Sequence, residues 1–268
     1  MKILAIGDPH GNLEKISSIS LEVISLVLIT GDLGEADLAR KRFFENSRRK
    51  KEGLPELKED AKFEKAVYNQ IHNSTLKVLK HFPKSVPVYT IQGNVGIYTE
   101  SEANKKNEKY GFNLKSTTGE IKKIGNISLT KNQLRVINGV RIGFLEYFTD
   151  VSWVKEFKPK DYDKYLKRAK RQTEKARRVL GRFGDLEILV CHQPPYGFLD
   201  TVNFPGVPKD WPGKHAGSKA ILDYIKKHQP KYVFCGHIHE GEGKAKIGKT
   251  EVYNLGVGGY KIVDFHPD

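Results

Sequence analysis

One short stretch near the start of the sequence, KILAIGDPH at residues 2–10, decides the fold class. Its apolar run, Lys2–Ile6, has the length of a buried strand, and Gly7 ends the run at once. Asp8 and His10 follow on a tight turn, two residues apart, so that both side chains can reach one cation. The stretch therefore predicts a strand that ends in a candidate metal site.

Four more apolar runs end in the same way, at residues that can bind a metal. The runs and the residues that follow them are Val23–Ile29 with Asp32, Val86–Ile91 with Asn94, Leu186–Val190 with His192, and Tyr232–Phe234 with His237 and His239. In open α/β sheets, ligands bind where the carboxyl ends of the strands converge. These five strand ends therefore predict an α/β fold with one shared site.

The residue types at these strand ends favour divalent metals. Histidine, aspartate and asparagine ligands without thiolates suit Mn, Fe, Zn, Ni or Co, and they differ from the cysteine-rich ligands of a structural zinc site. Seven ligands are too many for one ion, and they divide into two sets that share Asp32, whose two oxygens can bridge. His237 and His239 are expected on the same side of an extended backbone, with Gly236 relieving the crowding behind them.

Each candidate ligand also has an ordinary structural interpretation. A strand-end Asp or Asn often caps a turn, and a single His is usually a surface residue. Seven such residues at five ordered strand ends favour the metal site instead. Three further polar residues stay unassigned. Asn12 suits a backbone turn, whereas Asp200 and Glu240 suit either a hydrogen bond to a ligand imidazole or exposure to solvent.

Length and composition predict one globular domain over residues 1–268. Hydrophobic side chains make up 38% and charged ones 29% of the chain, which suits a continuous core and excludes a disordered or membrane-spanning protein. Apolar residues follow helical spacing in 63–82 and 162–183. We also expect a charged helical insertion at about 36–83.

Two antiparallel regions are expected in addition to the five strands. Asn138-Gly139 lies between two apolar runs and predicts a type I′ hairpin. A second antiparallel region is expected from Glu251–Tyr253 and Tyr260–Phe265.

Charge and cysteine content predict partners and compartment. Lys and Arg exceed Asp and Glu by 46 − 32 = 14, which favours anionic partners such as phosphates or nucleic acid. The first apolar run is too short for a signal peptide, and Cys191 and Cys235 cannot form a disulfide framework. We therefore expect a cytoplasmic protein that does not associate with membranes. Its oligomeric state is left open.

The order and spacing of the strand-end residues resemble the five motifs of calcineurin-like metallophosphoesterases. The motifs are Asp8-x-His10, Gly31-Asp32, Gly93-Asn94, His192 and Gly236-His237-x-His239, so the resemblance spans residues 8–239. It implies a four-layer α/β/β/α sandwich with mixed sheets and the metals at the carboxyl ends of the strands. It also implies one metal held by Asp8, His10, Asp32 and His239, and another held by Asp32, Asn94, His192 and His237.

A finer resemblance carries one departure from the family pattern. The strings HQPPYGFLD at 192–200, Gly217-Ser218 and GHIHEG at 236–241 are similar to the phosphodiesterase branch that includes the mammalian metallophosphoesterase-domain proteins. The third motif of the family usually continues with a His that contacts the phosphate and helps to protonate the leaving group. Here Val95 stands at that position, and it can do neither.

The resemblance implies a hydrolytic mechanism. Two divalent cations, Mn first and Fe, Ni, Zn, Co or Mg also suitable, would hold a hydroxide between them for in-line attack on the phosphorus of a phosphate ester. The lost acid contributes on the order of 10² to 10⁴ in rate. Since that loss affects poor leaving groups most, and branches without this His are known mainly as phosphodiesterases, we expect a phosphodiesterase in preference to a phosphomonoesterase.

One other histidine is a candidate for the missing acid. His215 lies in the Pro- and Gly-rich loop 203–217, which could fold over the metals. A solvated loop His is the ordinary alternative.

Two other functions fit the same fold. A non-catalytic scaffold is one, although such scaffolds usually lose metal ligands. A nuclease is the other, in which basic segments grip a strand of nucleic acid. These segments are Arg40-Lys41-Arg42, Arg48-Arg49-Lys50-Lys51, Lys167-Arg168, Lys170-Arg171 and Arg177-Arg178. Their ordinary interpretation is a solvated helix face.

Overall fold

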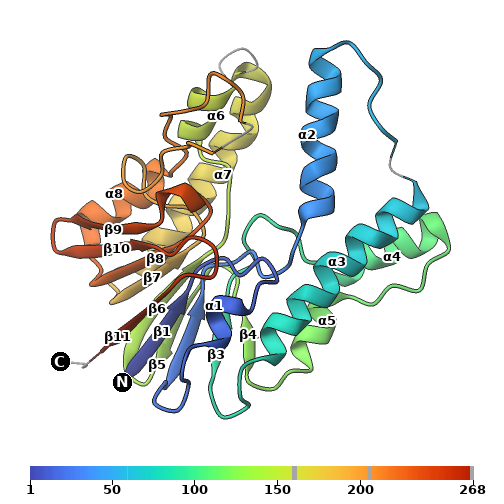
Figure 1. Cartoon of the computed structure of the whole chain (residues 1–268). Coiled ribbons are helices and arrows are strands. Elements are labelled where there is room, and N and C mark those ends of the chain that lie inside the picture. The colour runs from blue at the N-terminus through green and yellow to red at the C-terminus, as the bar shows by residue number, and fades with distance from the viewer. Residues whose placement is uncertain (59, 159–161, 205–206, 266–268) are drawn as a thin grey trace.

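Two β-sheets form the centre of the protein (Figure 1), and the computed structural model describes residues 1–58, 60–158, 162–204 and 207–265. The strands of the first sheet are parallel except β11, which runs antiparallel to β1. Their order across the sheet is β11 (Tyr260–Asp264), β1 (Lys2–Ile6), β2 (Leu26–Ile29), β3 (Val88–Thr90) and β4 (Ile127–Leu129).

The second sheet has a parallel centre and antiparallel edges. Strands β6, β7, β8 and β10 are parallel, whereas β5 and β9 are antiparallel to their neighbours. Their order is β5 (Gln133–Ile137), β6 (Val140–Leu145), β7 (Ile188–Cys191), β8 (Tyr232–Cys235), β10 (Thr250–Asn254) and β9 (Gly243–Ile247).

The two sheets pack face to face, and helices cover their outer faces. Leu28 of one sheet and Phe144 and Phe234 of the other share a fully buried cluster between the sheets. Burying side chains of this size contributes about 1.5–3 kcal/mol each. Helices α1 (Glu14–Ser17), α3 (Ala61–Lys80) and α5 (Thr117–Lys122) cover the first sheet, and α7 (Tyr162–Phe183) and α8 (Lys219–His228) cover the second. The predicted four-layer α/β/β/α sandwich is confirmed.

The predicted helices 63–82 and 162–183 correspond to α3 and α7. Asp60 begins α3, because its side chain accepts a hydrogen bond from the Phe63 backbone nitrogen at 2.7 Å. Within the range 36–83, α3 belongs to the helix layer, but α2 (Asp37–Lys51) buries none of its residues and stands away from the sheets (Figure 1). That residues 1–268 form one domain stays a prediction.

Two further α-helices are α4 (Glu100–Tyr110) and α6 (Val151–Phe157). Among the residues that the structure describes, no helix has the length and apolar character needed to cross a bilayer.

One predicted strand pairing is right and the other is wrong. The hairpin of β5 and β6 forms around Asn138 and Gly139, which have the positive φ values of 50° and 82° that a type I′ turn requires. The expected antiparallel pairing of Glu251–Tyr253 with Tyr260–Phe265 does not occur. The first of these segments lies in β10, beside β8 and β9, and the second lies in β11, beside β1. A local pattern identifies a strand but does not specify its partner.

Candidate metal centre

The predicted ligands come from both sheets and meet at one side of the sandwich. The first sheet contributes Asp8 and His10 after β1, Asp32 after β2 and Asn94 after β3, and the second sheet contributes His192 after β7 and His237 and His239 after β8. Asp8, Asp32 and His192 are buried, whereas the imidazole of His239 is partly exposed. The strand-end pattern therefore located one cluster of polar side chains.

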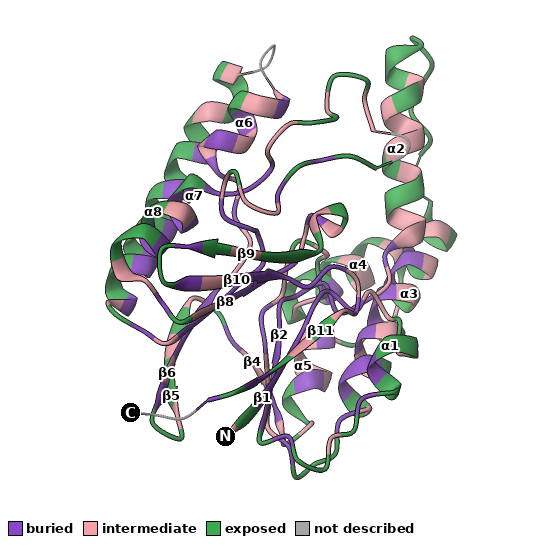
Figure 2. Ribbon diagram, turned by 60° about the vertical axis from the view of Figure 1, so that its left-hand side comes forward, coloured by how far each residue is buried: buried purple, intermediate pink, exposed green. Residues whose placement is uncertain are grey.

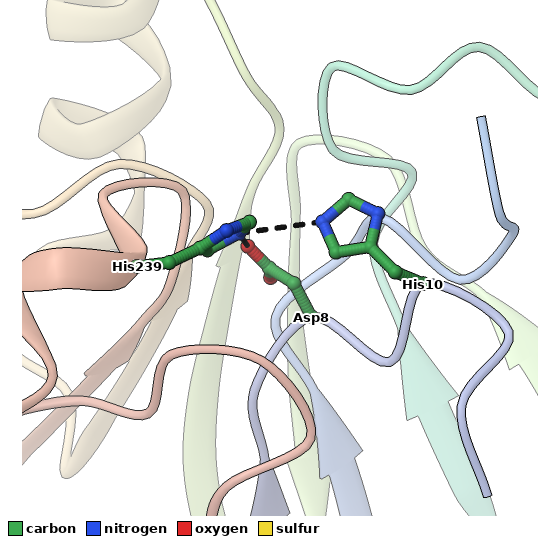
Figure 3. Close-up of side chains that lie close together, drawn as sticks. All are labelled: Asp8, His10 and His239. Carbon is green, nitrogen blue, oxygen red and sulfur yellow. Dashed lines mark hydrogen bonds and ion pairs between the residues drawn. The ribbon is translucent and has the colours of Figure 1, made fainter. Parts of the chain in front are cut away.

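One group of side chains gathers around the carboxylate of Asp8 (Figure 3). Nε2 of His239 lies 3.4 Å from Oδ2 of Asp8 and 3.3 Å from Nε2 of His10. The two ring nitrogens that face each other are both Nε2 atoms. Because their lone pairs would otherwise repel, either a proton on one of them or a cation between them is needed. Nδ1 of His10 is buried and has no hydrogen-bond partner among the described residues.

A second group forms around His192. Its Nδ1 donates a hydrogen bond of 3.0 Å to the backbone oxygen of Thr30, so Nε2 carries the lone pair in the neutral ring. That Nε2 lies 2.6 Å from Oδ1 of Asn94 and 3.5 Å from Oδ2 of Asp32. In the neutral ring all three of these atoms are acceptors, and either a proton on Nε2 of His192 or a cation at their centre would satisfy them together.

The ring of His237 lies on the His192 side of the site. Its centroid is 4.9 Å from that of His192 and 5.2 Å from that of Tyr147. The expectation of an extended backbone from His237 to His239 is wrong. His237 has a positive φ of 66°, and His239 begins the short 3₁₀ helix η2 (His239–Gly241). The chain turns between the two histidines, which places the ring of His239 beside Asp8 and that of His237 beside His192.

Three of the candidate ligands have a strained backbone. His10, Asp32 and His237 all lie in the left-handed region, with φ values of 46°, 40° and 66°. A positive φ is uncommon outside glycine and persists where surrounding contacts enforce it, often at functional sites.

Two glycines leave room for the ligand carboxylates. A Cβ on Gly236 would collide with the carboxyl group of Asp8, and a Cβ on Gly93 would collide with the side chain of Asp32. The backbone nitrogen of His237 donates 2.6 Å to Oδ2 of Asp8 across the same narrow space. The interpretation that Gly236 relieves crowding is confirmed, although the group it accommodates is Asp8.

The electrostatics of the site keep lone pairs available for a cation. Burial opposes protonation of His192, but the carboxylates of Asp32 and Asp8 raise the pKa of its imidazole. Burial also opposes ionisation of Asp8, but the charge of protonated His192 and the hydrogen bonds of His239 and Thr30 hold the pKa of Asp8 below the usual range. Burial raises the pKa of Asp32. Burial also lowers the pKa of His10, and it lowers that of His237 well below the ordinary value, so both imidazoles stay neutral.

The donor set fits two divalent ions. Two groups of three side chains, Asp8-His10-His239 and Asp8-Asp32-His192, place one ligand atom per residue within 4.8 Å of one another. Asp8 is common to both groups, whereas the resemblance implied that Asp32 is shared. Oδ2 of Asp32 also lies between the groups, 3.8 Å from Nε2 of His10. Carboxylate, imidazole and amide donors of this kind suit Mn, Fe, Zn, Ni or Co.

His215 forms a pair with Asp200 near the ligand segment. Its Nδ1 donates 2.7 Å to Oδ1 of Asp200, a buried carboxylate that also accepts the backbone nitrogens of Gly197 and Gly217. Ala216, the next residue, packs in one cluster with Ile238, which lies between His237 and His239.

The other polar residues that the sequence left open serve the backbone. Oδ1 of Asn12 accepts the Glu14 backbone nitrogen at 2.8 Å, and Oε1 of Glu240 accepts that of Asn203 at 2.9 Å. Val95 packs against the core of the first sheet and helix layer, and it contributes to the site only through its backbone.

Sequence reasoning missed Tyr147. Its ring centroid lies 5.2 Å from that of His237 and 5.9 Å from that of His192, in an edge contact. Burial raises its pKa, so the hydroxyl keeps its proton. Tyr147 follows β6 as the ligands follow their strands, and this sixth strand end was the signal that could have found it.

Comparisons with known proteins agree with this geometry. The family model described as calcineurin-like phosphoesterase matches residues 1–241. Metallophosphoesterase domain-containing protein 1 of Homo sapiens is 37% identical over 73 residues, which cover 27% of this chain and 20% of that protein. A UPF0046 protein of Caenorhabditis elegans is 31% identical over 70 residues, or 26% of this chain and 21% of that protein. The matched segment thus spans about a fifth of each curated relative.

A likeness to a solved structure extends over most of the chain. The phosphopantetheinyl hydrolase of Mycobacterium tuberculosis superposes with a TM-score of 0.53 and 13% identity, covering 96% of this chain and 89% of that one. At this identity the likeness concerns the fold.

Proposed function

Because the chain belongs to the calcineurin-like phosphoesterase family, we propose that it is a phosphoester hydrolase that works with two divalent metal ions. The observation that carries this proposal is the pair of three-residue groups that share Asp8, with ligand atoms within 4.8 Å of one another. Groups that converge in this way at strand ends, partly buried and with perturbed pKa values, are typical of a catalytic site.

We assign seven residues to the two ions. Asp8, His10, Asp32 and His239 would hold one ion, and Asp32, Asn94, His192 and His237 would hold the other. Manganese is our first choice, with Fe, Ni, Zn, Co and Mg as alternatives. Bound there, the ions would lower the pKa of a water molecule and neutralise the charge on the phosphoryl oxygens.

Residues behind the ligands orient them. The hydroxyl of Thr30 donates 2.6 Å to Oδ1 of Asp8, and the backbone oxygen of Thr30 accepts Nδ1–H of His192. One threonine thus supports a carboxylate and an imidazole from different sheets. The backbone nitrogen of Val95 donates 2.7 Å to Oδ1 of Asp32. Such partners fix ligand orientation and tautomer.

We favour a phosphodiester substrate. Val95 offers no side-chain proton donor, so departure of a strongly basic alkoxide would be slow, by about 10² to 10⁴ relative to an enzyme with an acid there. Aryl and other weakly basic leaving groups need no such donor. The missing donor therefore favours weakly basic leaving groups, and the resemblance to branches without this His, known mainly as phosphodiesterases, favours a diester.

His215 is our candidate for a substitute acid. Its Nδ1–H is taken by Asp200, so the second nitrogen of the ring is the position that can exchange a proton with a substrate. Its imidazole is partly exposed, at 39%. His215→Ala should lower activity and remove one limb of the pH profile. An unchanged rate and pH profile would contradict this role.

The basic segments differ in what they offer an anionic partner. Arg48 forms ion pairs with Glu45 and Glu52 at 2.8 and 2.6 Å, so the second run on α2 is partly neutralised by its own helix. Arg40, in the first run, lies near enough to His10 for its charge to help lower the pKa of that imidazole.

A cytoplasmic location is part of the proposal, supported by the two buried free thiols, Cys191 and Cys235.

Hydrolysis by the purified protein tests the proposal. The protein is loaded separately with Mn²⁺, Ni²⁺, Zn²⁺ and Mg²⁺ and assayed with bis-p-nitrophenyl phosphate and p-nitrophenyl phosphate. We expect metal-dependent hydrolysis, faster on the diester, that Asp32→Ala abolishes and the exposed control Asp223→Ala retains.

Metal content separates the enzyme from a scaffold. A folded protein that retains no transition metal after exposure to Mn²⁺ would support the scaffold. Equal background rates for the wild type and Asp32→Ala would contradict the proposed hydrolase.

A further inference from the structure

A segment of four residues, 146–149, borders both the metal centre and a cavity. Residues 146–149 follow β6, and side-chain amides hold three of their backbone nitrogens. Asn132 accepts from Glu146 at 3.1 Å, Gln193 from Phe148 at 3.3 Å and Gln172 from Thr149 at 2.7 Å. Gln193 is the neighbour of His192. Segment 146–149 is therefore held both to the ligand segment, through Gln193, and to α7, through Gln172.

All four residues of this segment line the cavity, which has a volume of about 370 Å³. Tyr147 lines it and also contacts the rings of His192 and His237, so the cavity adjoins the metal centre at this side chain. The volume falls within the range of small-molecule sites, roughly 300 to 1,000 Å³.

Helix α7 carries buried, intermediate and exposed residues along its length (Figure 2), and one face of this helix lines the cavity. Arg168, Gln172 and Lys175 all line it, and their spacing of four and three residues places them on the same face of a helix. Arg168 and Lys175 are exposed and need no rearrangement to meet a ligand. The charged face that the sequence pattern assigned to solvent thus borders a concave site.

The cavity has a positive charge surplus. Lys131, Arg168 and Lys175 contribute three positive charges, and Glu146 contributes one negative charge. Glu146 pairs with Lys131 at 3.6 Å. Within the described part of the chain, no carboxylate forms an ion pair with Arg168 or Lys175. Two cations therefore remain for an anionic ligand.

We propose that this cavity binds a second phosphate group of the substrate, so that the natural substrate is a phosphodiester carrying a further phosphate. The reacting phosphate would lie at the metal centre, which makes the inference rest on the proposed function. Arg168 would bind the second phosphate with its planar guanidinium group and Lys175 with its ammonium group. A nucleoside bisphosphate and a nucleic acid strand both offer two phosphate groups of this kind.

A matched substrate pair tests the second phosphate. Thymidine 5′-(p-nitrophenyl phosphate) and its 3′-phosphorylated counterpart release the same p-nitrophenolate and differ only in the added phosphate. We expect the 3′-phosphate to raise kcat/KM about tenfold or more, mainly through a lower KM. Arg168→Ala and Lys175→Ala should bring the ratio of the two kcat/KM values toward one. Arg182→Ala, an exposed change elsewhere on α7, should keep the ratio.

Binding without turnover tests the same idea independently. Calorimetry with thymidine 3′,5′-bisphosphate on the metal-free protein should show one site that Arg168→Ala weakens about tenfold or more and Arg182→Ala retains. Competition by a thymidine decamer distinguishes the sources of the phosphate. Stronger competition than by the bisphosphate indicates a strand, and weaker competition indicates a free nucleotide, provided that Arg168→Ala weakens both.

The two proposals fail separately. Hydrolysis of bis-p-nitrophenyl phosphate with no effect of the 3′-phosphate, and no effect of Arg168→Ala on bisphosphate binding, would overturn the second phosphate site alone. Binding that depends on Arg168 in a protein without any hydrolysis would leave the second site standing and contradict the hydrolase.

Discussion

The backbone nitrogen of Val95 donates a hydrogen bond of 2.7 Å to Oδ1 of Asp32. The residue that replaces the usual histidine of the third motif therefore still supports a ligand carboxylate. Its backbone role and its missing side-chain role are separable, because substitution of the side chain leaves the backbone nitrogen in place.

Val95→His should restore leaving-group assistance. We expect the rate on the most basic leaving groups to rise by up to about 10², with little change for p-nitrophenolate. The measurement is the dependence of kcat/KM on leaving-group pKa across a series of aryl phosphodiesters, which should become shallower in the variant. An identical slope in both proteins would show that position 95 does not face the leaving group.

Thr30→Val should weaken metal binding without disturbing the fold. The change removes the hydroxyl that donates to Asp8 but keeps the backbone oxygen that accepts from His192. Loss of such a supporting hydrogen bond typically costs 10- to 100-fold in metal affinity, on the order of what we expect here. Titration of the metal-free protein with Mn²⁺ measures it. Thr90→Val, another buried threonine, serves as the control, and equal affinities in the two variants would argue against orientation by Thr30.

Gly236→Ala should disrupt the site, because the added methyl group would occupy the position of the Asp8 carboxylate. We expect reduced metal content and lower thermal stability. Gly181→Ala is the matched change, since nothing lies within 4 Å of its added Cβ on the exposed face of α7. It should stabilise the protein by about 0.5–1 kcal/mol, as alanine favours a helix over glycine. Normal metal content in Gly236→Ala would show that Asp8 can move aside.

His72 should make the folded protein less stable in acid. Burial lowers its pKa below the ordinary 6.5, and its Nδ1 lies 2.8 Å from Oγ1 of Thr117, so the folded state resists its protonation. As the pH falls through 6.5, the unfolded chain takes up a proton that the folded protein does not, and stability decreases. Above that pH both states are neutral at this residue. Urea unfolding between pH 5 and 7.5 should show a shallower decrease in His72→Gln, and parallel curves would exclude this contribution.

The clustering of the candidate ligands was predictable because each of them follows a strand within a few residues. Short apolar runs such as Lys2–Ile6 identified the strands, and the polar residue after each run identified the site. The family motifs then indicated the four-layer sandwich, and the match of the calcineurin-like phosphoesterase model and the named metallophosphoesterase relatives confirm that resemblance.

Other features depend on contacts that a local pattern does not encode. The packing of whole sheets decides which strands β10 and β11 pair with. The apolar residues within these two strands therefore could not show that the strands belong to different sheets. The left-handed φ of His237 arises where its backbone meets Asp8, which is distant in sequence. Tyr147 was overlooked because it is neither a metal ligand nor preceded by a glycine.

The division of the ligands between the two sheets has a consequence for how the protein matures. The last ligand of the first sheet is Asn94, and the first ligand of the second is His192, almost a hundred residues later. A ribosome synthesising the chain releases one half of the coordination set well before the other. Because metal binding requires the ligands to be brought together by folding, the complete centre can assemble only after β8 and His239 have emerged. Under the proposed assignment, metal loading would follow translation, and a truncated nascent chain would not capture both ions.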